Sequence, residues 1–399
     1  MTTALQNIRV LDMSRVLAGP WAGQLLGDYG ADVVKIERPG QGDDTRQWGP
    51  PWLGSESAYY LSANRNKRSV TVDIAKPSGQ ELIRDLAREA DVLLENFKTG
   101  TLERYNLDPQ ELMAENPKLI VCSISGYGQS GSRAGEPAYD AMIQASGGLM
   151  SITGPAADEP GGPQKVGVAI ADIMAGMYAS TAILAALNAR ATTGQGQRID
   201  VPLYDSQVAW LANQNMNFLV GGEVPGRMGT AHPNLVPYQA FRTSDGDLML
   251  AVGNDRQFGD CMETIGTPEL ARDELFATNA ARIQNRQQLI ATMSAQLLSK
   301  TTAFWLNAFA ERGVPAGPIS NVGEVLSGAY AVERGLVRSL SNGAGDPVPT
   351  VANPVAFDGT PVRYEFAPPL LGEHTDEVLR EWLGYSPEMI AELRSQAAI

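Results

Sequence analysis

Short apolar segments alternate with amphipathic helices through the first third of this chain, and that alternation restricts the fold more than any other feature. Residues 8–14 and 31–37 have the composition of buried strands, and between them a helix begins at Pro20 and ends before Gly30. A strand, a helix and a second strand within about 30 residues form a βαβ unit with parallel strands and a right-handed crossover. The pattern repeats, with strands expected at 69–74, 91–97 and 118–125 and helices at 109–115 and at 78–90, where Ser78 is the expected cap.

This repetition predicts an α/β fold built on a Rossmann-like, doubly wound parallel sheet. Ligands of such sheets bind beyond the carboxyl ends of the strands. Arg38, Asn96 and Phe97 come at or just after the ends of expected strands, so we expect them at that edge. A helix over 173–190 is rich in Ala, Gly and Ser, which suits close packing, and residues 198–203 read as one more strand.

The pattern changes after residue 200, which indicates a second domain. Alternating runs over 238–253 flank Ser244-Asp245-Gly246-Asp247, a turn sequence that joins hairpin strands. The Gly- and Pro-rich stretch 328–369 is expected to be an extended return segment, followed by a helix at 373–383. We therefore divide the chain into a large domain at 1–200 completed by about 330–399, a linker helix at 201–224 and a small α+β domain at 225–325.

The charge balance and the rare residue types limit the chemistry. Lys and Arg total 31 against 45 Asp and Glu, a net charge of -14, so we expect neither nucleic acid nor an anionic membrane as partner. Only two histidines occur, which removes most His-based catalysis, and the two cysteines form no CxxC pair that would suggest a metal site. No basic leader or stretch of about 20 apolar residues is present, so a cytoplasmic or organelle-matrix location is expected, with the cytoplasm preferred.

One carboxylate, Asp172, stands in an apolar segment that runs from Val166 to Met174. A desolvated carboxylate has a raised pKa and is a stronger nucleophile, which makes Asp172 a candidate catalytic residue. The alternative is structural, because an Asp just before an apolar helical run is a preferred helix N-cap. The local sequence alone leaves both interpretations open.

Two further motifs have a functional and a structural interpretation. Gly126-Tyr127-Gly128-Gln129-Ser130-Gly131 matches G-x-G-x-x-G, but a loop composition follows it where a dinucleotide-binding motif would open a helix, so we expect a flexible loop. Arg38 and Arg46 flank the turn 40–45, which is either a solvated turn or an anion site, because Arg binds phosphate and carboxylate through two donors. The basic cluster 64–68 extends this region.

Together these segments resemble the class III CoA-transferases, the family of formyl-CoA transferase and carnitine CoA-transferase. The resemblance covers essentially the whole chain. It is carried, in order, by residues 10–12 and 16–20, 33–39, Asn66-Lys67-Arg68-Ser69, Glu95-Asn96-Phe97, 125–129, the stretch around Asp172, 313–318 and Leu371-Gly372-Glu373-His374-Thr375.

The resemblance implies that Asp172 is the nucleophile and that CoA and acyl-CoA are substrates, with no metal or separate cofactor. It also implies an interlocked homodimer. Ten positions are implied to bind CoA: Val16, Ala18, Arg38, Val72, Ala75, Asn96, Phe97, Arg104, Tyr139 and Asp140. The family often has Lys at the position of Ala75, where this chain has Lys76 next to it.

Within the family, residues 42–51, 229–232 and 236–241 resemble the succinyl-CoA:glutarate branch. We therefore expect CoA to move from a dicarboxyl-CoA such as succinyl-CoA to a dicarboxylate such as glutarate. The glycine-rich loop of formyl-CoA transferase has no counterpart at 253–257, which argues against oxalate. Candidate substrate residues are Arg46, for the distal carboxylate, and Trp48, Arg65, Arg227 and His232.

Two alternatives remain at this point. One is an α-methylacyl-CoA racemase, although Tyr139-Asp140 stands where racemases have a His-Asp pair. The other is a non-catalytic CoA-binding module in which Asp172 only caps a helix.

Overall fold

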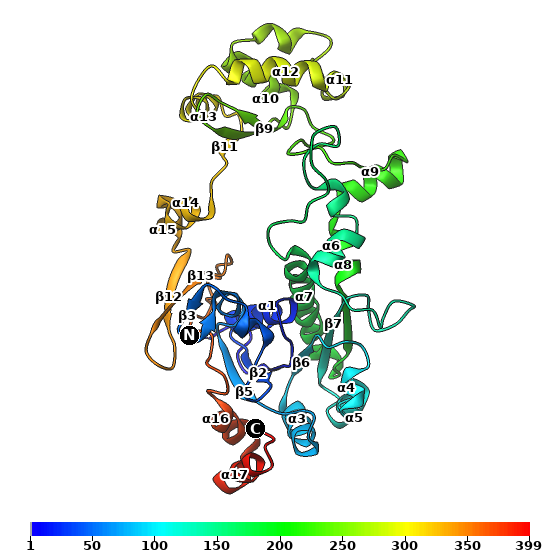
Figure 1. The fold of residues 1–399 in the computed structure, drawn as a ribbon, viewed down its shortest axis with the longest axis vertical. Coiled ribbons are helices and arrows are strands. Elements are labelled where there is room, and N and C mark those ends of the chain that lie inside the picture. Colours follow the sequence, from blue (N-terminus) through cyan, green and yellow to red (C-terminus); the bar gives the residue numbers. More distant parts are fainter. Residues whose placement is uncertain (1) are drawn as a thin grey trace. The chain divides into compact units, whose positions relative to one another are not determined.

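The computed structural model describes residues 2–399, which form two compact units (Figure 1). The first unit contains the described part of Met1–Leu149 together with Lys165–Gly222 and Ala329–Ile399. The second contains Met150–Gln164 and Glu223–Gly328. Residues 150–164 therefore belong with the second unit, whereas the sequence pattern suggested the large domain.

The first unit is built on a sheet in which the described residues supply six parallel strands, as expected (Figure 1). The strand order is β5-β2-β1-β6-β7-β8. Since β1 lies between β2 and β6, the chain reverses its direction of travel across the sheet there, and ligands bind at the carboxyl end of such a point. The strands are β1 (Arg9–Asp12), β2 (Asp32–Glu37), β5 (Lys67–Thr71), β6 (Val92–Glu95), β7 (Ile120–Ser125) and β8 (Arg198–Pro202).

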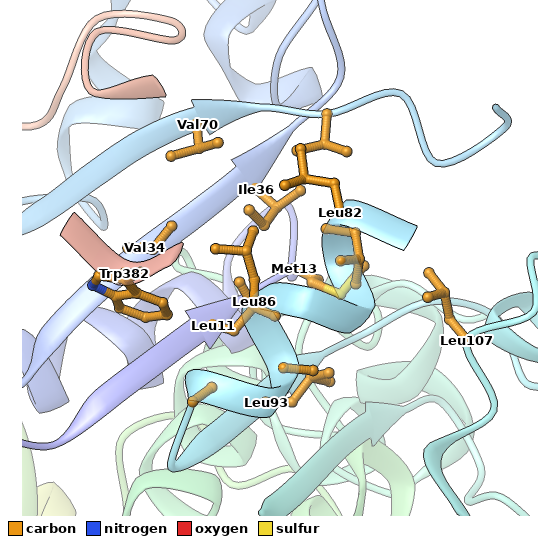
Figure 2. Close-up of a cluster of buried hydrophobic side chains, with 14 of the residues drawn as sticks. Leu11, Met13, Val34, Ile36, Val70, Leu82, Leu86, Leu93, Leu107 and Trp382 are labelled. Atoms are coloured by element: carbon orange, nitrogen blue, oxygen red, sulfur yellow. The ribbon is translucent and has the colours of Figure 1, made fainter. Parts of the chain in front are cut away.

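Both faces of this sheet are covered, because successive side chains of a strand point to opposite faces. Val10 belongs to a buried cluster with helices α1 (Ala18–Asp28) and α7 (Ile170–Thr193). Its neighbour Leu11 belongs to another cluster with α3 (Pro77–Glu89) and α16 (Thr375–Leu383). Figure 2 shows the second cluster, in which Leu86 and Trp382 lie with strand residues such as Val34. Both faces of the central strands therefore carry buried apolar residues, as in other doubly wound folds.

Helices α1 and α7 pack closely. A Cβ atom at Gly176 would lie 2.5 Å from the carbonyl oxygen of Ala18, so a larger residue would push the helices apart. Among the described residues α7 is long and apolar enough to cross a membrane by length and composition. Its small residues Ala171, Ala175 and Ala179 are instead buried in the core of this unit.

Several local expectations were wrong. The linker helix expected at 201–224 is two helices, α8 (Leu203–Trp210) and α9 (Asn213–Gly221), because Ala212 adopts a positive φ of 48° between them. Ser78 does not cap α3, which begins at Pro77. The expected extended segment contains a helix and a hairpin: α15 (Ala329–Arg334), β12 (Val337–Ser341) and β13 (Pro347–Val351).

The second unit contains the predicted hairpin. Strands β9 (Tyr238–Arg242) and β10 (Asp247–Ala251) pair antiparallel, and β11 (Ala316–Pro318) pairs with β10. Helices α10 (Asp255–Ile265), α11 (Asn279–Gln284), α12 (Arg286–Leu297), α13 (Thr302–Glu311) and α14 (Val322–Ser327) belong to the same unit, with 3-10 turns at Met150–Ile152 and Pro268–Arg272.

The remaining elements of the first unit are a 3-10 turn at Asp44–Gln47, β3 (Trp52–Leu53), β4 (Glu56–Ser57), α2 (Ala58–Leu61), α4 (Thr101–Arg104), α5 (Pro109–Glu115), α6 (Asp140–Ser146) and α17 (Pro387–Ser395).

Candidate active site

The loops after β1 and β6 meet at the point where the strand order reverses. Asn96 joins them, because its side-chain oxygen accepts the N–H of Arg15 at 2.8 Å and its side-chain nitrogen donates to the Arg15 carbonyl at 2.7 Å. The Arg15 guanidinium lies over the Phe97 ring, 5.3 Å from its centre. These contacts fix a basic and aromatic surface at the carboxyl end of the sheet.

A groove follows this edge and consists of two cavities of about 390 Å³ and 250 Å³. Both are lined by Arg15, Asp44 and Phe97, so they are neighbours. The structure brings most of the expected CoA residues to this groove: Arg38, Val72, Ala75 and Phe97 line the larger cavity, and Val16, Ala18, Asn96, Phe97 and Tyr139 line the smaller one with Asp172.

Two of the expected CoA residues do not line either cavity. Arg104 is exposed and donates to the hydroxyl of Thr101 at 3.2 Å, and Thr101 lines the larger cavity. Asp140 lies at the start of α6 and acts on Asp172 rather than on the groove directly. Lys76, the neighbour of Ala75, donates to the carbonyl of Gln396 at 2.9 Å.

Arg15 and Lys98 line the groove and were missed in the sequence. Arg15 follows β1 closely, just as Arg38 follows β2, so the rule that selected Arg38 could have selected Arg15. Lys98 comes three residues after the end of β6. An acidic protein that binds a polyanion needs such local cations.

Asp172 is the third residue of α7 and lines the smaller cavity. It is not the helix cap, because the N-cap position is Ala169. The capping function belongs to Asp140, whose carboxylate accepts the N–H of Ala171 at 2.7 Å. The structural alternative for Asp172 was therefore wrong, and its carboxylate is left facing the groove.

Burial and the charge of Asp140 raise the pKa of Asp172 to about 7. A helix N-terminus would lower the pKa of a nearby carboxylate, so desolvation and like-charge repulsion outweigh the helix dipole here. The apolar stretch before α7 is not the main cause of the desolvation, since Val168 is 53% exposed.

Tyr59 on α2 is a second group near Asp172 that was missed in the sequence. Burial and the charges of Asp172 and Asp140 raise the pKa of Tyr59 to about 12. Its hydroxyl therefore stays protonated and can donate a hydrogen bond. The Trp48 ring packs edge-on against Tyr59, with ring centres 5.1 Å apart, which places the expected substrate residue Trp48 beside it.

Arg46 does not face the groove, contrary to expectation. It is buried, and it donates to both carboxylate oxygens of Glu37 at 2.9 and 2.7 Å. A second ion pair joins Arg46 to Glu56 at 2.7 Å. Since two carboxylates already neutralise this guanidinium, its role is structural.

Arg65 is another expected substrate residue that the structure assigns to the core. Its guanidinium pairs with the carboxylate of Asp28, with contacts of 2.8 and 2.5 Å, and also donates to the Val351 carbonyl. The sequence cluster 64–68 is thus a set of buried structural residues. Whether a basic residue near a strand end binds a ligand or forms a structural ion pair depends on its tertiary partners, which the sequence does not show.

Arg227 and His232 both lie in the second unit. Arg227 donates to the Pro155 carbonyl at 3.2 Å, and the His232 ring accepts the N–H of Asn234 at 3.0 Å. Burial and the charge of Arg286 lower the pKa of His232, so its ring is neutral at pH 7.

The glycine motif after β7 lies in a loop that opens no helix, which confirms the loop part of the expectation. A Cβ atom at Gly126 would lie 2.2 Å from the Cβ atom of Ala138. Glycine is therefore required for residues 138–139 to approach the end of β7, and Gly126, Ala138 and Tyr139 all line the smaller cavity. The motif shapes the groove next to Asp172.

Comparison with known proteins identifies the family of this chain. The family model described as "CoA-transferase family III" matches residues 5–375. The chain is 47% identical to a succinate–glutarate CoA-transferase of Agrobacterium fabrum, over 94% of this chain and 95% of that protein. It is 42% identical to human succinyl-CoA:glutarate CoA-transferase, over 99% of this chain and 90% of that protein.

A crystal structure of a CAIB/BAIF family protein from Brucella suis superimposes with a TM-score of 0.84 at 44% identity, covering 96% of this chain and 100% of that one. The likeness thus extends over both units, and the family match includes the segments that form the groove. The chain belongs to CoA-transferase family III and is a class III CoA-transferase.

Proposed function

We propose that this enzyme transfers CoA from succinyl-CoA to glutarate, with Asp172 as the nucleophile. The names of its relatives support these substrates. The observation that carries the role of Asp172 is its position, half-buried in a groove whose other residues suit CoA, with a raised pKa and no cation paired to it in the described part of the chain. A carboxylate without a structural partner is free to react.

Every step of the proposed reaction transfers an acyl group between a carboxylate and the CoA thiolate. The Asp172 carboxylate attacks the succinyl-CoA thioester, forming an aspartyl–succinyl anhydride and releasing CoA thiolate. The thiolate attacks the aspartyl carbonyl, which gives an aspartyl-CoA thioester and frees succinate. Glutarate then attacks that thioester to form a second anhydride, and the released thiolate takes the glutaryl group, which restores Asp172.

No step requires a proton acceptor, and each intermediate retains the energy of the thioester, so the site must exclude water. The groove has the groups to stabilise the tetrahedral oxyanions. Helix α1 begins at this groove without a side-chain cap, so backbone N–H groups of its first turn are available as donors. The Tyr59 hydroxyl is a further candidate donor, because the charge of Asp172 acts on it, although Tyr59 lines neither cavity.

CoA recognition follows from the basic and aromatic groups at the sheet edge. Arg38, Arg15 and Lys98 would pair with phosphates, and the Phe97 ring would contact the adenine or the pantetheine chain. For the distal carboxylate of the acceptor, Arg227 and His232 remain candidates, since Arg46 and Arg65 are neutralised by buried carboxylates.

We also propose a homodimer. Helix α9 presents apolar side chains to solvent in the single chain, with Leu219 71% and Val220 80% exposed, and Met177 and Tyr178 of α7 are also exposed. Large apolar side chains exposed in this way are typical of an interface between subunits. Light scattering that gives the mass of one chain at micromolar concentration would contradict this proposal.

The transfer is tested by incubating the enzyme with succinyl-CoA and single carboxylic acids and measuring new acyl-CoA by mass spectrometry. Glutarate should be a better acceptor than acids with one carboxylate. Failure to form any acyl-CoA would refute the proposal. Incubation of a 2-methylacyl-CoA in deuterium oxide is the comparison, because α-carbon exchange without acid exchange would indicate a racemase.

A further inference from the structure

The loop between β1 and α1 contains a strained residue. Val16 has a φ of +70°, and among the described non-glycine residues with positive φ it is the only β-branched one. A β-branched side chain strongly disfavours this left-handed conformation, so other contacts must impose it. The same loop lines the smaller cavity next to Asp172 through Arg15, Val16 and Leu17.

A buried ion pair supplies these contacts. The carboxylate of Asp43 accepts the N–H of Val16, with both oxygens 3.3 Å from the nitrogen. Lys35 donates to Asp43 at 2.9 Å and to the Ser14 carbonyl at 2.9 Å. Both charged side chains have no exposed surface, and the ion pair with Lys35 overcomes the effect of burial and lowers the pKa of Asp43 to about 2.

Three consecutive residues of the loop are therefore held through their backbones. Lys35 binds the carbonyl of Ser14, Asn96 binds both backbone groups of Arg15, and Asp43 binds the N–H of Val16. Lys35 belongs to β2, and Asp43 also caps the 3-10 turn Asp44–Gln47 by accepting the N–H of Thr45 at 3.0 Å. Their contacts with residues 14–16, however, complete no helix or strand, since β1 has ended and α1 begins at Ala18.

The conformation of Val16 determines the direction of the backbone N–H groups and of the Arg15 side chain beside the groove. Only Leu17 separates Val16 from the first turn of α1, whose backbone N–H groups have no side-chain cap and whose first residue, Ala18, lines the same cavity as Asp172. If Val16 relaxed to a negative φ, the peptide units on either side would rotate, and these donors and the Arg15 side chain would change direction. The transfer reaction depends on donors that meet the developing oxyanion in a fixed place.

We propose that the buried Lys35–Asp43 pair is a positioning unit for catalysis, which holds Val16 in the left-handed conformation so that the start of α1 is directed at the carbonyl under attack. This proposal rests on the proposed transfer reaction. Lys35 and Asp43 act through the loop and do not touch the reacting atoms.

The test removes both members of the pair together, so that neither Lys35 nor Asp43 is left buried without its partner. The double substitution Lys35→Met with Asp43→Leu replaces the pair by apolar groups, which buried pairs often tolerate. We expect a folded protein whose kcat falls by about tenfold or more, with a smaller change in KM for succinyl-CoA, because the donors act in the transition state. Thr45→Val is the matched control, since Thr45 bonds to the same carboxylate but not to the loop. It should keep most of the activity.

Rescue by glycine separates positioning from a general loss of structure. In a Val16→Gly background the left-handed conformation costs little, so the same double substitution should lower kcat much less than it does in the natural chain. Equal losses in both backgrounds would overturn the proposal, as would a normal kcat in the double variant. An unmodified enzyme that forms no glutaryl-CoA would refute the transfer reaction itself, which distinguishes the two failures.

Discussion

Replacement of Asp140 by asparagine tests what sets the reactivity of Asp172. The amide oxygen of an asparagine can still accept the N–H of Ala171, which the Asp140 carboxylate accepts at 2.7 Å, so the start of α7 should remain capped. The negative charge, however, is lost. Since this charge disfavours ionisation of Asp172, Asp140→Asn should lower the pKa of Asp172.

The size of the effect follows from the two causes of the raised pKa. The pKa of Asp172 rises from 3.8 to about 7, and burial contributes more than Asp140. Removal of the Asp140 charge should therefore lower the pKa by no more than about 1.5, or about 2 kcal/mol. At pH 6 the ionised fraction of Asp172 would then increase from about one tenth to at most about three quarters.

The assay is the pH dependence of kcat/KM for glutaryl-CoA formation, which reports ionisation in the free enzyme. In the natural enzyme the rate should fall below pH 7 as Asp172 becomes protonated, and in Asp140→Asn this fall should begin at lower pH. The control is Asp346→Asn, which removes an exposed charge in the β12–β13 hairpin. If the acid limb of Asp140→Asn coincides with that of the natural enzyme, Asp140 does not control Asp172.

Three further substitutions are predicted to separate chemistry from stability. Asp172→Asn should abolish transfer. This substitution should also raise the free energy of unfolding, and by more at pH 8 than at pH 5. The pKa of Asp172 is higher in the folded protein than in the unfolded chain, so its ionised form increasingly destabilises the folded protein as the pH rises from about 4 to 7. Thermal unfolding at pH 5 and pH 8 checks this. Arg46→Ala should lower the free energy of unfolding by about 3–5 kcal/mol, because it leaves Glu37 and Glu56 buried without their cation. Denaturant unfolding measures that loss, and a large selective rise in KM for glutarate would instead restore Arg46 as a substrate residue. Tyr59→Phe should lower kcat by about tenfold or more with a smaller change in KM, if its hydroxyl stabilises the oxyanion; steady-state kinetics with succinyl-CoA would contradict this by showing an unchanged kcat.

The sheet could be predicted from the sequence because its signals are local. Apolar strands such as 31–37 and helices such as 109–115 are each determined by a few neighbouring residues, and the parallel arrangement follows from the short crossovers. The helix break at Ala212 had no comparable signal. A positive φ at alanine depends on packing around the break and not on the residue itself.

The candidate site was predicted only in part, because the sequence does not show which carboxylate or ligand each arginine contacts. Arg15, Arg38 and Arg46 all occur close to strand ends, yet the first two line the groove and the third is buried between Glu37 and Glu56. The partners come from segments that the sequence does not place together. For the same reason, the capping role could be assigned to Asp140 only after α6 and α7 were seen in contact.

Asp140 connects the stability of the site with its reactivity. A carboxylate that caps a helix is favourable, because it satisfies a backbone donor and interacts with the positive end of the helix. Asp140 occupies that position by accepting the N–H of Ala171 at the start of α7. Its charge makes the same environment less favourable for ionised Asp172, the residue that directly follows Ala171. Burial and the Asp140 charge together keep the carboxylate of Asp172, the proposed nucleophile, more basic than a free carboxylate. Such a division of roles explains how a carboxylate near a helix N-terminus can have a raised pKa and still lie in a stable fold.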